Sequence, residues 1–432
     1  MALRRLLYQI RGHVLARVSK NAIALLVAQV GTRAMNLALI ALVTRVLGVA
    51  GLGRYLLAMT AQAIALSVAD LGLNTYTTRE FSRDETVDDA ETWGTVLGLK
   101  LLAAMCGVLL LHAVVAPLSP GRQGAISIIS WSLLPDAFNA VATARIKARQ
   151  RMEISGAITL GIRVLHALAG GGLIWLGYDE RALLAAYGGA SLLGSCVFFV
   201  VLSYWRVPAH LKGFLLGWRG VLRESVPFAM TGMVAMLYTR TDLLILSSWQ
   251  GDAAAGLYGA AYRLWEALGM IPSSFLDALF PELSRAGDRA SGDCRLRTLY
   301  RRGKQITYVV VALLMVPAQL LARLIVTLLY GNAADTQISV GILRVLLLAF
   351  PFTYLYLLNG HTLYAAGRQR RVTAAMVAVT AVNALCNALA VPVLSYWGAA
   401  LDKLASEALL FLLLQGMVRQ TVLYERSVEK GG

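Results

Sequence analysis

Charged residues and cysteines are scarce in this sequence. Only 15% of its 432 residues are Asp, Glu, Lys or Arg, whereas 58% are hydrophobic and the mean hydropathy is +0.63. A soluble domain of this length needs far more polar surface to cover its core, so the composition excludes an ordinary soluble protein. No metal-ligand spacing links the cysteines, and we expect buried small side chains or free thiols, and no metal site, at Cys106, Cys196, Cys294 and Cys386.

A nucleotide-binding loop of the Gly-x4-Gly-Lys-Ser/Thr type is also missing, which excludes direct use of ATP, and we expect no cofactor. Acidic residues are the minority charge, with 24 Asp and Glu against 40 Lys and Arg. In a soluble protein this excess would suggest a nucleic-acid partner. Here the basic residues lie in alternate loops between apolar runs, so orientation in a membrane explains them and we expect no nucleic-acid binding.

Long apolar runs recur along the whole chain, and each is long enough to cross about 30 Å of hydrocarbon as a helix. Hydropathy therefore predicts an all-α polytopic membrane protein with twelve transmembrane helices. Their expected ranges are 20–44, 54–77, 93–116, 123–144, 155–177, 181–204, 225–249, 255–280, 304–329, 338–360, 373–394 and 398–421.

Basic residues mark one side of this predicted protein. Twenty-eight of them lie at the termini and in the even-numbered connections, against four in the opposite loops, which are Arg45, Arg54, Arg122 and Arg181. By the positive-inside rule, we expect a multi-pass protein of the plasma (inner) membrane with both termini cytoplasmic.

Two stretches 203 residues apart share one pattern: Gly48-x4-Gly53-x-Tyr55-x2-Ala58 and Gly251-x4-Gly256-x-Tyr258-x2-Ala261. The recurrence predicts a duplicated half with six helices in each copy, so both copies have the same topology and are related by an axis along the membrane normal. We expect an N-terminal lobe at 1–204, a cytoplasmic linker at 205–224 and a C-terminal lobe at 225–432, around a central cavity.

A series of short motifs runs in order along nearly the whole chain. The first half carries Arg45-Val46-Leu47-Gly48, Gly53-x-Tyr55, Asp70-Leu71-Gly72-Leu73 and Thr78-Arg79-Glu80. The second half carries Glu224-Ser225-Val226-Pro227-Phe228, Asp242, Gly256-x-Tyr258-x2-Ala261-x-Arg263, Phe280-Pro281-Glu282-Leu283-Ser284, Leu328-Leu329-Tyr330-Gly331, Ala366-Gly367-Arg368 and Trp397-Gly398-Ala399-Ala400. Together they resemble the bacterial oligosaccharide flippases of the polysaccharide transporter family.

This family is part of the multidrug/oligosaccharidyl-lipid/polysaccharide exporter superfamily, so the resemblance implies a MATE-like fold of two six-helix lobes. It further implies transfer of an undecaprenyl-pyrophosphate-linked oligosaccharide from the inner to the outer leaflet, for O-antigen, capsule or exopolysaccharide assembly. Implied partners are the lipid-linked oligosaccharide, membrane lipids, a polysaccharide polymerase and glycosyltransferases. Lipid II flippases of the same superfamily usually have fourteen spans, so twelve fit the polysaccharide branch better.

A pyrophosphate can cross hydrocarbon only in a wet, cationic pocket, and arginine suits it because its planar fork binds phosphate oxygens in pairs and stays protonated. Arg33 lies about twelve residues from either end of its predicted span, and Gln29, Arg33 and Asn36 share one helical face. We expect this face to line the cavity, because charges inside a membrane are usually functional. The alternative is a structural ion pair.

Further intramembrane arginines are binding candidates. Arg263 either faces the cavity or pairs with Glu266 three residues on, and Arg240 and Asp242 point to different faces of one helix. The remaining candidates, with a weaker basis, are Arg163, which is followed by His166, and Arg344. We expect Lys100 and Arg323 to snorkel to an interface, and Asn383 and Asn387 to bond between helices.

An ion gradient is one way to drive transport, and downhill movement of the substrate is another. The intramembrane carboxylates that can exchange a proton or bind sodium are Asp70, Asp136, Asp242, Glu266, Asp402 and Glu407. Asp70, Asp242 and Glu266 are our main candidates, while Asp70 and Asp136 have capping or local pairing as an alternative. Proton, sodium and membrane potential all stay open.

Three rival functions compete with the flippase. A polysaccharide polymerase or ligase needs catalytic groups on a large external loop, and the predicted external loops are too short for one. A multidrug or cation antiporter on the same architecture should line its cavity with carboxylates, whereas the deepest charges here are mainly arginines. A purely structural assembly factor gives no reason for buried arginines. We therefore predict a transporter and not an enzyme.

Overall fold

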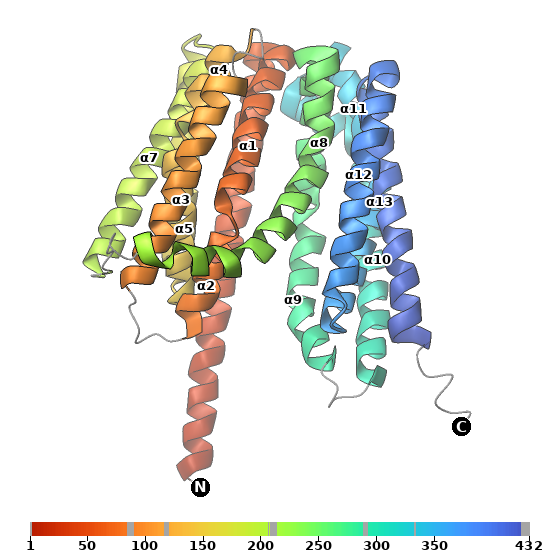
Figure 1. Cartoon of the computed structure of the whole chain (residues 1–432). Helices are drawn as coiled ribbons and strands as arrows, with labels where there is room; N and C mark the ends of the chain where they lie inside the picture. The colour runs from red at the N-terminus through yellow and green to blue at the C-terminus, as the bar shows by residue number, and fades with distance from the viewer. Residues whose placement is uncertain are drawn as a thin grey trace. The chain divides into compact units, whose positions relative to one another are not determined.

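The computed structural model is helical through almost all of the residues that it describes, which are 2–83, 90–115, 121–205, 207, 214–287, 293–331 and 334–424 (Figure 1). The backbone alone is described for 2–28, 83, 114, 214–216, 231, 293–294, 334, 336 and 422–424. The α-helices are α1 Ala2–Asp70, α2 Leu73–Arg83, α3 Ala90–Leu110, α4 Gln123–Ser130, α5 Leu133–Ala148, α6 Met152–Trp175, α7 Glu180–Tyr204, α8 Phe214–Leu268, α9 Met270–Gly287, α10 Asp293–Tyr330, α11 Ala334–Ala365, α12 Gln369–Leu394 and α13 Tyr396–Val418. A short π-helical turn follows α3 at Leu111–Val115, and another follows α13 at Arg419–Tyr424.

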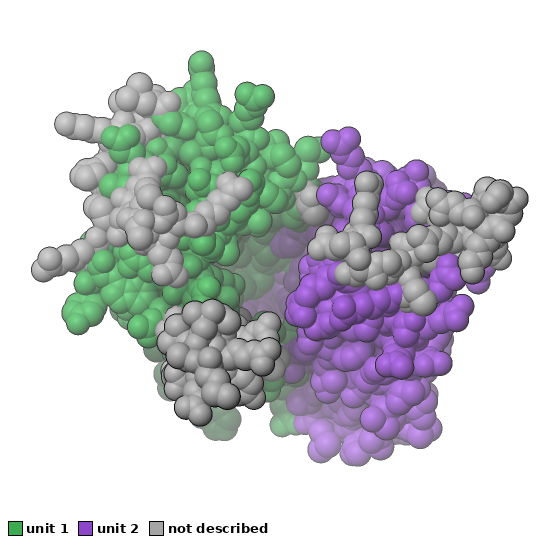
Figure 2. All heavy atoms as spheres, turned by 90° about the horizontal axis from the view of Figure 1, so that it is seen from below, with its two compact units in different colours: residues 1–47, 58–233 green, residues 48–57, 234–432 purple. Residues whose placement is uncertain are grey.

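Two compact units make up the chain (Figure 2). Unit 1 contains residues 1–47 and 58–233, and unit 2 contains residues 48–57 and 234–432. The predicted linker at 205–224 is described only in part, because positions 206 and 208–213 lie outside the described residues; α8 begins at Phe214, within that range. The lobe boundaries expected from the sequence stay a prediction.

Eight helical stretches of the described residues are long and apolar enough to cross a membrane. They overlap nine of the twelve predicted spans, because the stretch Gln29–Asp70 covers most of the first two. The other three predicted spans are 225–249, 255–280 and 398–421, which carry charged side chains such as Asp242, Arg263 and Lys403. The chain is a multi-pass membrane protein, as predicted.

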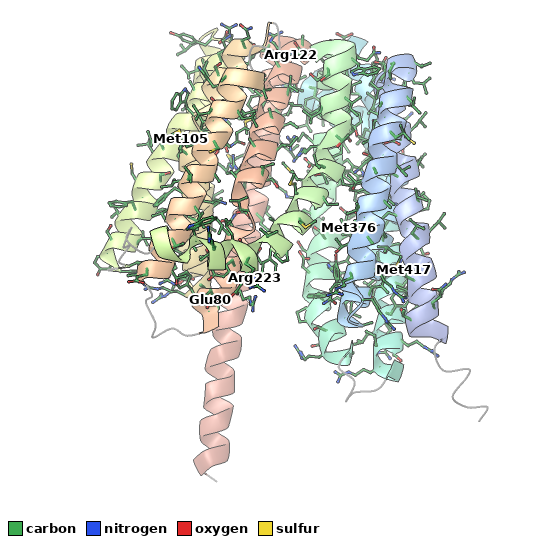
Figure 3. The ribbon with its side chains drawn as sticks, viewed as in Figure 1. Glu80, Met105, Arg122, Arg223, Met376 and Met417 are labelled. Atoms are coloured by element: carbon green, nitrogen blue, oxygen red, sulfur yellow. The ribbon has the colours of Figure 1, made fainter. Side chains whose placement is uncertain are left out.

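Unit 1 is held together by an apolar core near one end of α2, α3, α5 and α7. Phe81 and Trp93 pack edge to face, with ring centroids 6.2 Å apart, and the buried Arg145 guanidinium lies 3.6 Å from the Phe81 ring centroid. A cation over an aromatic face is stabilising once both are removed from water. Glu80 and Arg223 lie at this end of unit 1 and Arg122 at the opposite end, the sidedness that the charge pattern predicts (Figure 3).

The repeated glycine pattern forms two equivalent turns. Gly48 and Gly251 have the same left-handed conformation, with φ/ψ of 69°/−177° and 85°/−176°, which breaks each long helix at that point. A Cβ at Gly53 would lie 1.8 Å from the Asp252 carbonyl oxygen, and a Cβ at Gly256 would lie 1.8 Å from that of Val49. Each turn therefore packs on the other in the same way, as expected of a duplication with a local two-fold axis.

Candidate functional site

Unit 1 contains an open cavity of about 630 Å³. Helices α1, α2, α5, α6 and α7 contribute to its wall, and the polar lining residues are Asn74, Thr75, Thr78, Asp136, Asn139, Thr143, Lys147, Thr159, Arg163 and Tyr187. The wall carries two basic side chains and one acidic one. A cavity of this size, with charged and hydroxyl groups converging on it, is suited to a polar ligand.

A second cavity of about 280 Å³ adjoins the first. Gln29 and Arg33 of α1 line it, and Thr143, Lys147 and Thr159 line both cavities. Lys147 lies one residue before the end of α5, so the sequence places it in a cytoplasmic loop, but its side chain turns inward. Asn36 is half-buried on α1 and does not line this cavity, so only Gln29 and Arg33 of the predicted polar face come together here.

Arg33 and Arg163 lie at the same depth in unit 1. A Cβ at Gly31 would lie 2.8 Å from Leu160 Cδ1, and one at Gly171 would lie 3.2 Å from Leu42 Cδ2. Both pairs differ by 129 residues, so α1 and α6 run side by side in one register, which puts Arg33 level with the residue before Arg163. That level is the eleventh of the 24 residues of α6, near the middle of the helix. Two guanidinium-bearing residues therefore occupy the middle of unit 1.

Asp136 faces the larger cavity and is held by neutral donors from two helices. Ser191 Oγ donates to its Oδ1, while Gln62 Nε2 and Tyr187 Oη donate to its Oδ2, the last at 3.0 Å. Asp136 follows Pro135, which cannot donate the helical hydrogen bond to the Trp131 carbonyl, and the helix is interrupted between α4 and α5 at that point.

Asp70 pairs with Lys100 inside unit 1. Lys100 Nζ contacts Asp70 Oδ1 and lies 3.4 Å from Asn74 Oδ1, and the Lys100 side chain is 0% exposed. The expectation that Lys100 snorkels to an interface is wrong. A buried ammonium needs a carboxylate close by, and Asp70 supplies it. The alternative reading of Asp70, local pairing, is the one that the structure shows.

Unit 2 places one carboxylate between two arginines of α8. Glu266 Oε2 lies 2.8 Å from Arg263 Nη1, and its Oε1 lies 3.5 Å from Arg240 Nη2. The Arg263–Glu266 pair weighed from the sequence is thus formed, and Arg240 joins it. All three side chains are roughly a fifth exposed. Two cations share one anion, which leaves a net positive charge.

Asp242 is buried in unit 2 next to this group. Tyr258 Oη and the backbone N–H of Leu243, the latter at 2.8 Å, donate to its two carboxylate oxygens. The space that it shares with Arg240 and Arg263 is only about 10 Å³, too small for more than one water. Arg344 lies apart from this group on α11: its side chain is exposed, and its carbonyl accepts a hydrogen bond of 2.9 Å from Gln319 Nε2.

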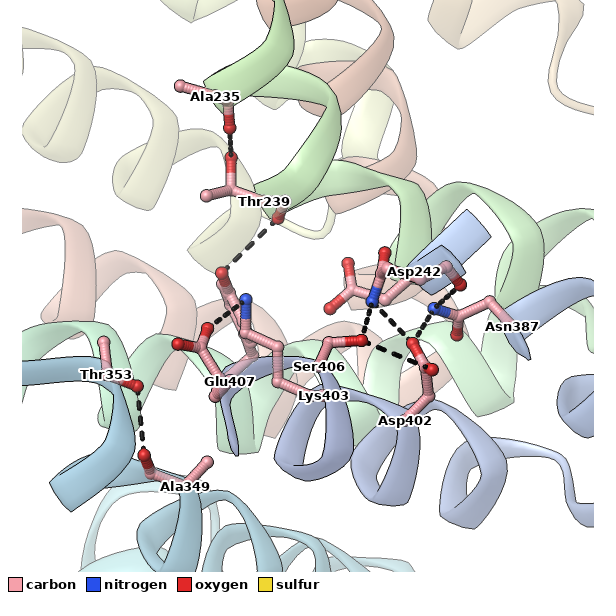
Figure 4. Close-up of polar contacts among 12 residues, drawn as sticks. Ala235, Thr239, Asp242, Ala349, Thr353, Asn387, Asp402, Lys403, Ser406 and Glu407 are labelled. Carbon is pink, nitrogen blue, oxygen red and sulfur yellow. Dashed lines mark hydrogen bonds and ion pairs between the residues drawn. The ribbon is translucent and has the colours of Figure 1, made fainter. Parts of the chain in front are cut away.

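A buried polar cluster joins α12 to α13 in unit 2 (Figure 4). Asn383 Nδ2 and Asn387 Nδ2 both donate to Asp402 Oδ2, and Asn383 also donates to Ser406 Oγ at 3.1 Å. The sequence prediction that these asparagines bond between helices is confirmed. Next to them, Lys403 Nζ lies 2.9 Å from Glu407 Oε1 and 4.5 Å from the Tyr238 ring centroid.

Lys147 and Lys403 are two basic residues that the sequence analysis did not name as site candidates. The signal for Lys403 is present, since a lysine and a glutamate four residues apart inside an apolar run form a helical pair. For Lys147 the sequence gives no such signal, because three arginines surround it in what reads as an ordinary basic loop.

The sequence profile of the family described as "Polysaccharide biosynthesis protein" matches residues 18–287. The chain belongs to this family. The profile described as "Lipid II flippase MurJ" matches residues 214–430. Among curated proteins, no sequence match is found.

Solved structures of the MOP superfamily share the fold. Lipid II flippase MurJ in an inward closed conformation is 16% identical, with a TM-score of 0.78 over 92% of this chain and 87% of that one. A multidrug resistance MATE family transporter of the MOP superfamily matches in its inward-facing conformation, at 16% identity and a TM-score of 0.71 over 94% and 99% of the two chains. An outward-facing MATE structure matches at 14% identity and a TM-score of 0.67, over 96% and 97%. The MATE-like fold predicted from the sequence is confirmed.

Proposed function

We propose that this family member is a flippase that moves an undecaprenyl-pyrophosphate-linked oligosaccharide from the inner to the outer leaflet of the bacterial plasma membrane, by alternating access of two six-helix lobes. The observation that carries the proposal is the pair of adjoining cavities in unit 1. Arg33 lines one, Arg163 the other, and Lys147 both. A pyrophosphate in this place meets three cations in a hydroxyl-lined, wet environment inside the membrane protein.

The chemistry of the wall matches the two parts of such a headgroup. Guanidinium groups bind phosphate oxygens in pairs, and the lysine adds a mobile point charge. Threonine, asparagine and tyrosine side chains around them can both donate and accept hydrogen bonds, which suits sugar hydroxyls. The polyprenyl tail needs no site of its own, because it stays in hydrocarbon.

In unit 2 we assign a secondary binding role to Arg240 and Arg263. Glu266 cancels only one of their two charges, so an anion can compete with it for either guanidinium. Arg344 and Asn36 remain proposed substrate contacts, and the only basis for them is that each lies deep within its predicted membrane span. Asp242 and Glu266 remain proposed ion-coupling groups; Asp70 is the weakest of that set, because Lys100 already neutralises it.

The rival cation antiporter has less support in unit 1. Its larger cavity holds Lys147 and Arg163 against one carboxylate, Asp136, and the adjoining cavity holds Arg33 and Lys147. A drug cation would be repelled by such a wall, since two like charges in a poorly screened site cost several kcal/mol.

Reconstitution tests the proposal directly. The purified chain is placed in vesicles with a radiolabelled undecaprenyl-pyrophosphate disaccharide, and an added glycosidase reports how much sugar reaches the outer face. We expect vesicles with the chain to expose the inner pool and vesicles with Arg33→Ala/Arg163→Ala to behave like protein-free ones. A chain that leaves the inner pool protected, or that transports an organic cation instead, contradicts the proposal.

A further inference from the structure

The structure separates the six intramembrane carboxylates by what surrounds them. Three of them have basic partners: Asp70 with Lys100, Glu266 with Arg240 and Arg263, and Glu407 with Lys403. Asp242 and Asp402 are buried in the packed interior of unit 2. Asp136 alone of the six lines the larger cavity of unit 1. Water, and therefore protons, can reach it there.

Both carboxylate oxygens of Asp136 accept hydrogen bonds from uncharged donors, namely the Gln62 amide, the Tyr187 phenol and the Ser191 hydroxyl. Such donors hold a carboxylate in place without fixing its charge as an ion pair would. Asp136 can therefore gain a proton and still keep most of its contacts. Protonation of Asp70 instead strips the buried Lys100 of its partner, and protonation of Glu266 removes the carboxylate that the partly exposed Arg240 and Arg263 share.

Tyr187 connects this carboxylate to the cationic wall. Its hydroxyl donates to Asp136, and the Arg163 guanidinium lies over its ring, 5.3 Å from the centroid. Asp136 and Arg163 also line the same cavity. A phosphate held by Arg163 therefore brings negative charge close to the Asp136 carboxylate.

We propose that Asp136 is a proton-binding site linked to the headgroup, so that unit 1 takes up a proton at Asp136 when a pyrophosphate binds beside Arg163. The inference rests on the proposed function, because it takes the pyrophosphate of that substrate as the ligand. Its physical basis is repulsion: two negative charges in one poorly hydrated cavity disfavour each other, and a proton on the carboxylate removes the conflict. Linkage then makes low pH strengthen headgroup binding by the same amount.

The other titratable and charged groups near Asp136 are few. Helix α6 supplies Arg163 and His166, whose ring centroid lies 5.1 Å from that of Tyr187, and α5 itself supplies Lys147 at the cavity wall. Helix α2 faces the cavity with Asn74, Thr75 and Thr78, and α1 with Leu66. Lys100 of α3 pairs with Asp70. Among the described residues of these helices, His166 is therefore the competing proton acceptor that the experiment has to separate.

Calorimetry measures the linkage. The full chain in lipid nanodiscs is titrated with a farnesyl-pyrophosphate-linked monosaccharide, a diester with no proton that titrates between pH 5.5 and 8. The titration is done over this range in two buffers of different ionisation enthalpy, which gives the protons taken up per bound probe. In the wild type we expect an uptake of about one proton per bound probe, and an affinity that rises about tenfold for each unit by which the pH falls. Asp136→Asn should bind without uptake and with a flat pH profile, whereas His166→Gln and the matched control Asp402→Asn should keep the wild-type uptake.

A fourth variant covers misfolding of Asp136→Asn. Tyr187→Phe keeps the ring and the carboxylate but removes one donor to the ionised form, so the midpoint of its binding profile should move to higher pH. The inference is overturned if proton uptake survives in Asp136→Asn or disappears in His166→Gln or Asp402→Asn. It is also overturned if the midpoint of the binding profile of Tyr187→Phe stays at the wild-type pH. Binding of the probe without any proton uptake in the wild type overturns the inference alone; no binding at all overturns the proposed function with it.

Discussion

Lys403 and Glu407 form an ion pair of 2.9 Å in which each side chain is only 1% exposed. The ammonium also lies near the rings of Tyr238, Tyr262 and Trp265, at 4.5, 5.9 and 5.6 Å from their centroids. Water is thus replaced by one carboxylate and three aromatic faces. A pair of this kind costs much desolvation to form, so its partners depend on each other.

Removing one member of this pair should therefore be worse than removing both. We expect Lys403→Met to lower the free energy of unfolding by about 3–5 kcal/mol, because it leaves Glu407 charged and buried without a cation. The double variant Lys403→Met/Glu407→Met should recover most of that loss. Thermal unfolding of the detergent-solubilised protein measures both, with the exposed Arg302→Met as control. Equal losses in the single and double variants would contradict the pairing.

Cations in unit 1 should matter for transport more than for stability. Arg33→Ala, Arg163→Ala and Lys147→Ala should each slow translocation about ten- to a hundredfold, the equivalent of one lost charge-assisted hydrogen bond of about 1.5–3 kcal/mol. Arg33→Lys should fall between, because it keeps the charge and loses the fork. Surface polysaccharide in a flippase-deficient strain reports the effect, and the exposed Arg370→Ala is the basic control. Wild-type polysaccharide from the three alanine variants, at normal membrane levels, would refute the assignment.

Glu266 should be more important to unit 2 than either arginine that it binds. Glu266→Gln leaves two guanidinium groups without a carboxylate, whereas Arg240→Gln leaves the closer Arg263–Glu266 pair in place. Because the three side chains are partly exposed, we expect losses of about 1–2 kcal/mol for Glu266→Gln and under about 1 kcal/mol for Arg240→Gln. Melting curves rank the two, and the reverse order would show that Glu266 is not the shared partner.

The two glycine turns should be equally intolerant of a methyl group. Gly53→Ala and Gly256→Ala each place a Cβ 1.8 Å from a carbonyl oxygen, so the backbone must shift, at an expected cost of about 1–3 kcal/mol. Gly161→Ala in α6, where a Cβ meets nothing within 4 Å, is the control and should be neutral or stabilising. The combined Gly53→Ala/Gly256→Ala variant should lose less than the two single losses added, because one shift relieves both contacts. Strict additivity would mean that the turns adjust independently.

Much of the fold could be predicted from the sequence because a membrane imposes simple rules. Length and hydropathy find most spans, and loop charge gives their orientation. Prediction from hydropathy is less accurate for a helix whose polar side chains bond to one another inside the protein. Lys403 and Glu407 are an example: their spacing of four residues indicates a helical pair, but only the structure shows that both side chains are buried, each 1% exposed.

The candidate site was predictable only in part, for a similar reason. The depth of Arg33 and Arg163 follows from their position in a span, and the structure places both beside cavities of unit 1. The pairing of carboxylates with cations depends on how each helix is rotated about its axis. Hydropathy gives no information about this rotation. Asp70 therefore ranked high from the sequence and Asp136 low, whereas the cavity wall reverses the order.

The reciprocal contact of the two glycine turns also bears on the history of the chain. After a duplication, each copy can drift wherever it folds by itself. At these turns each copy packs on the other, so a side chain added at Gly53 or Gly256 would collide with the main chain of the opposite turn. The two turns are therefore constrained together, and we infer that this constraint preserves the repeated glycine pattern there.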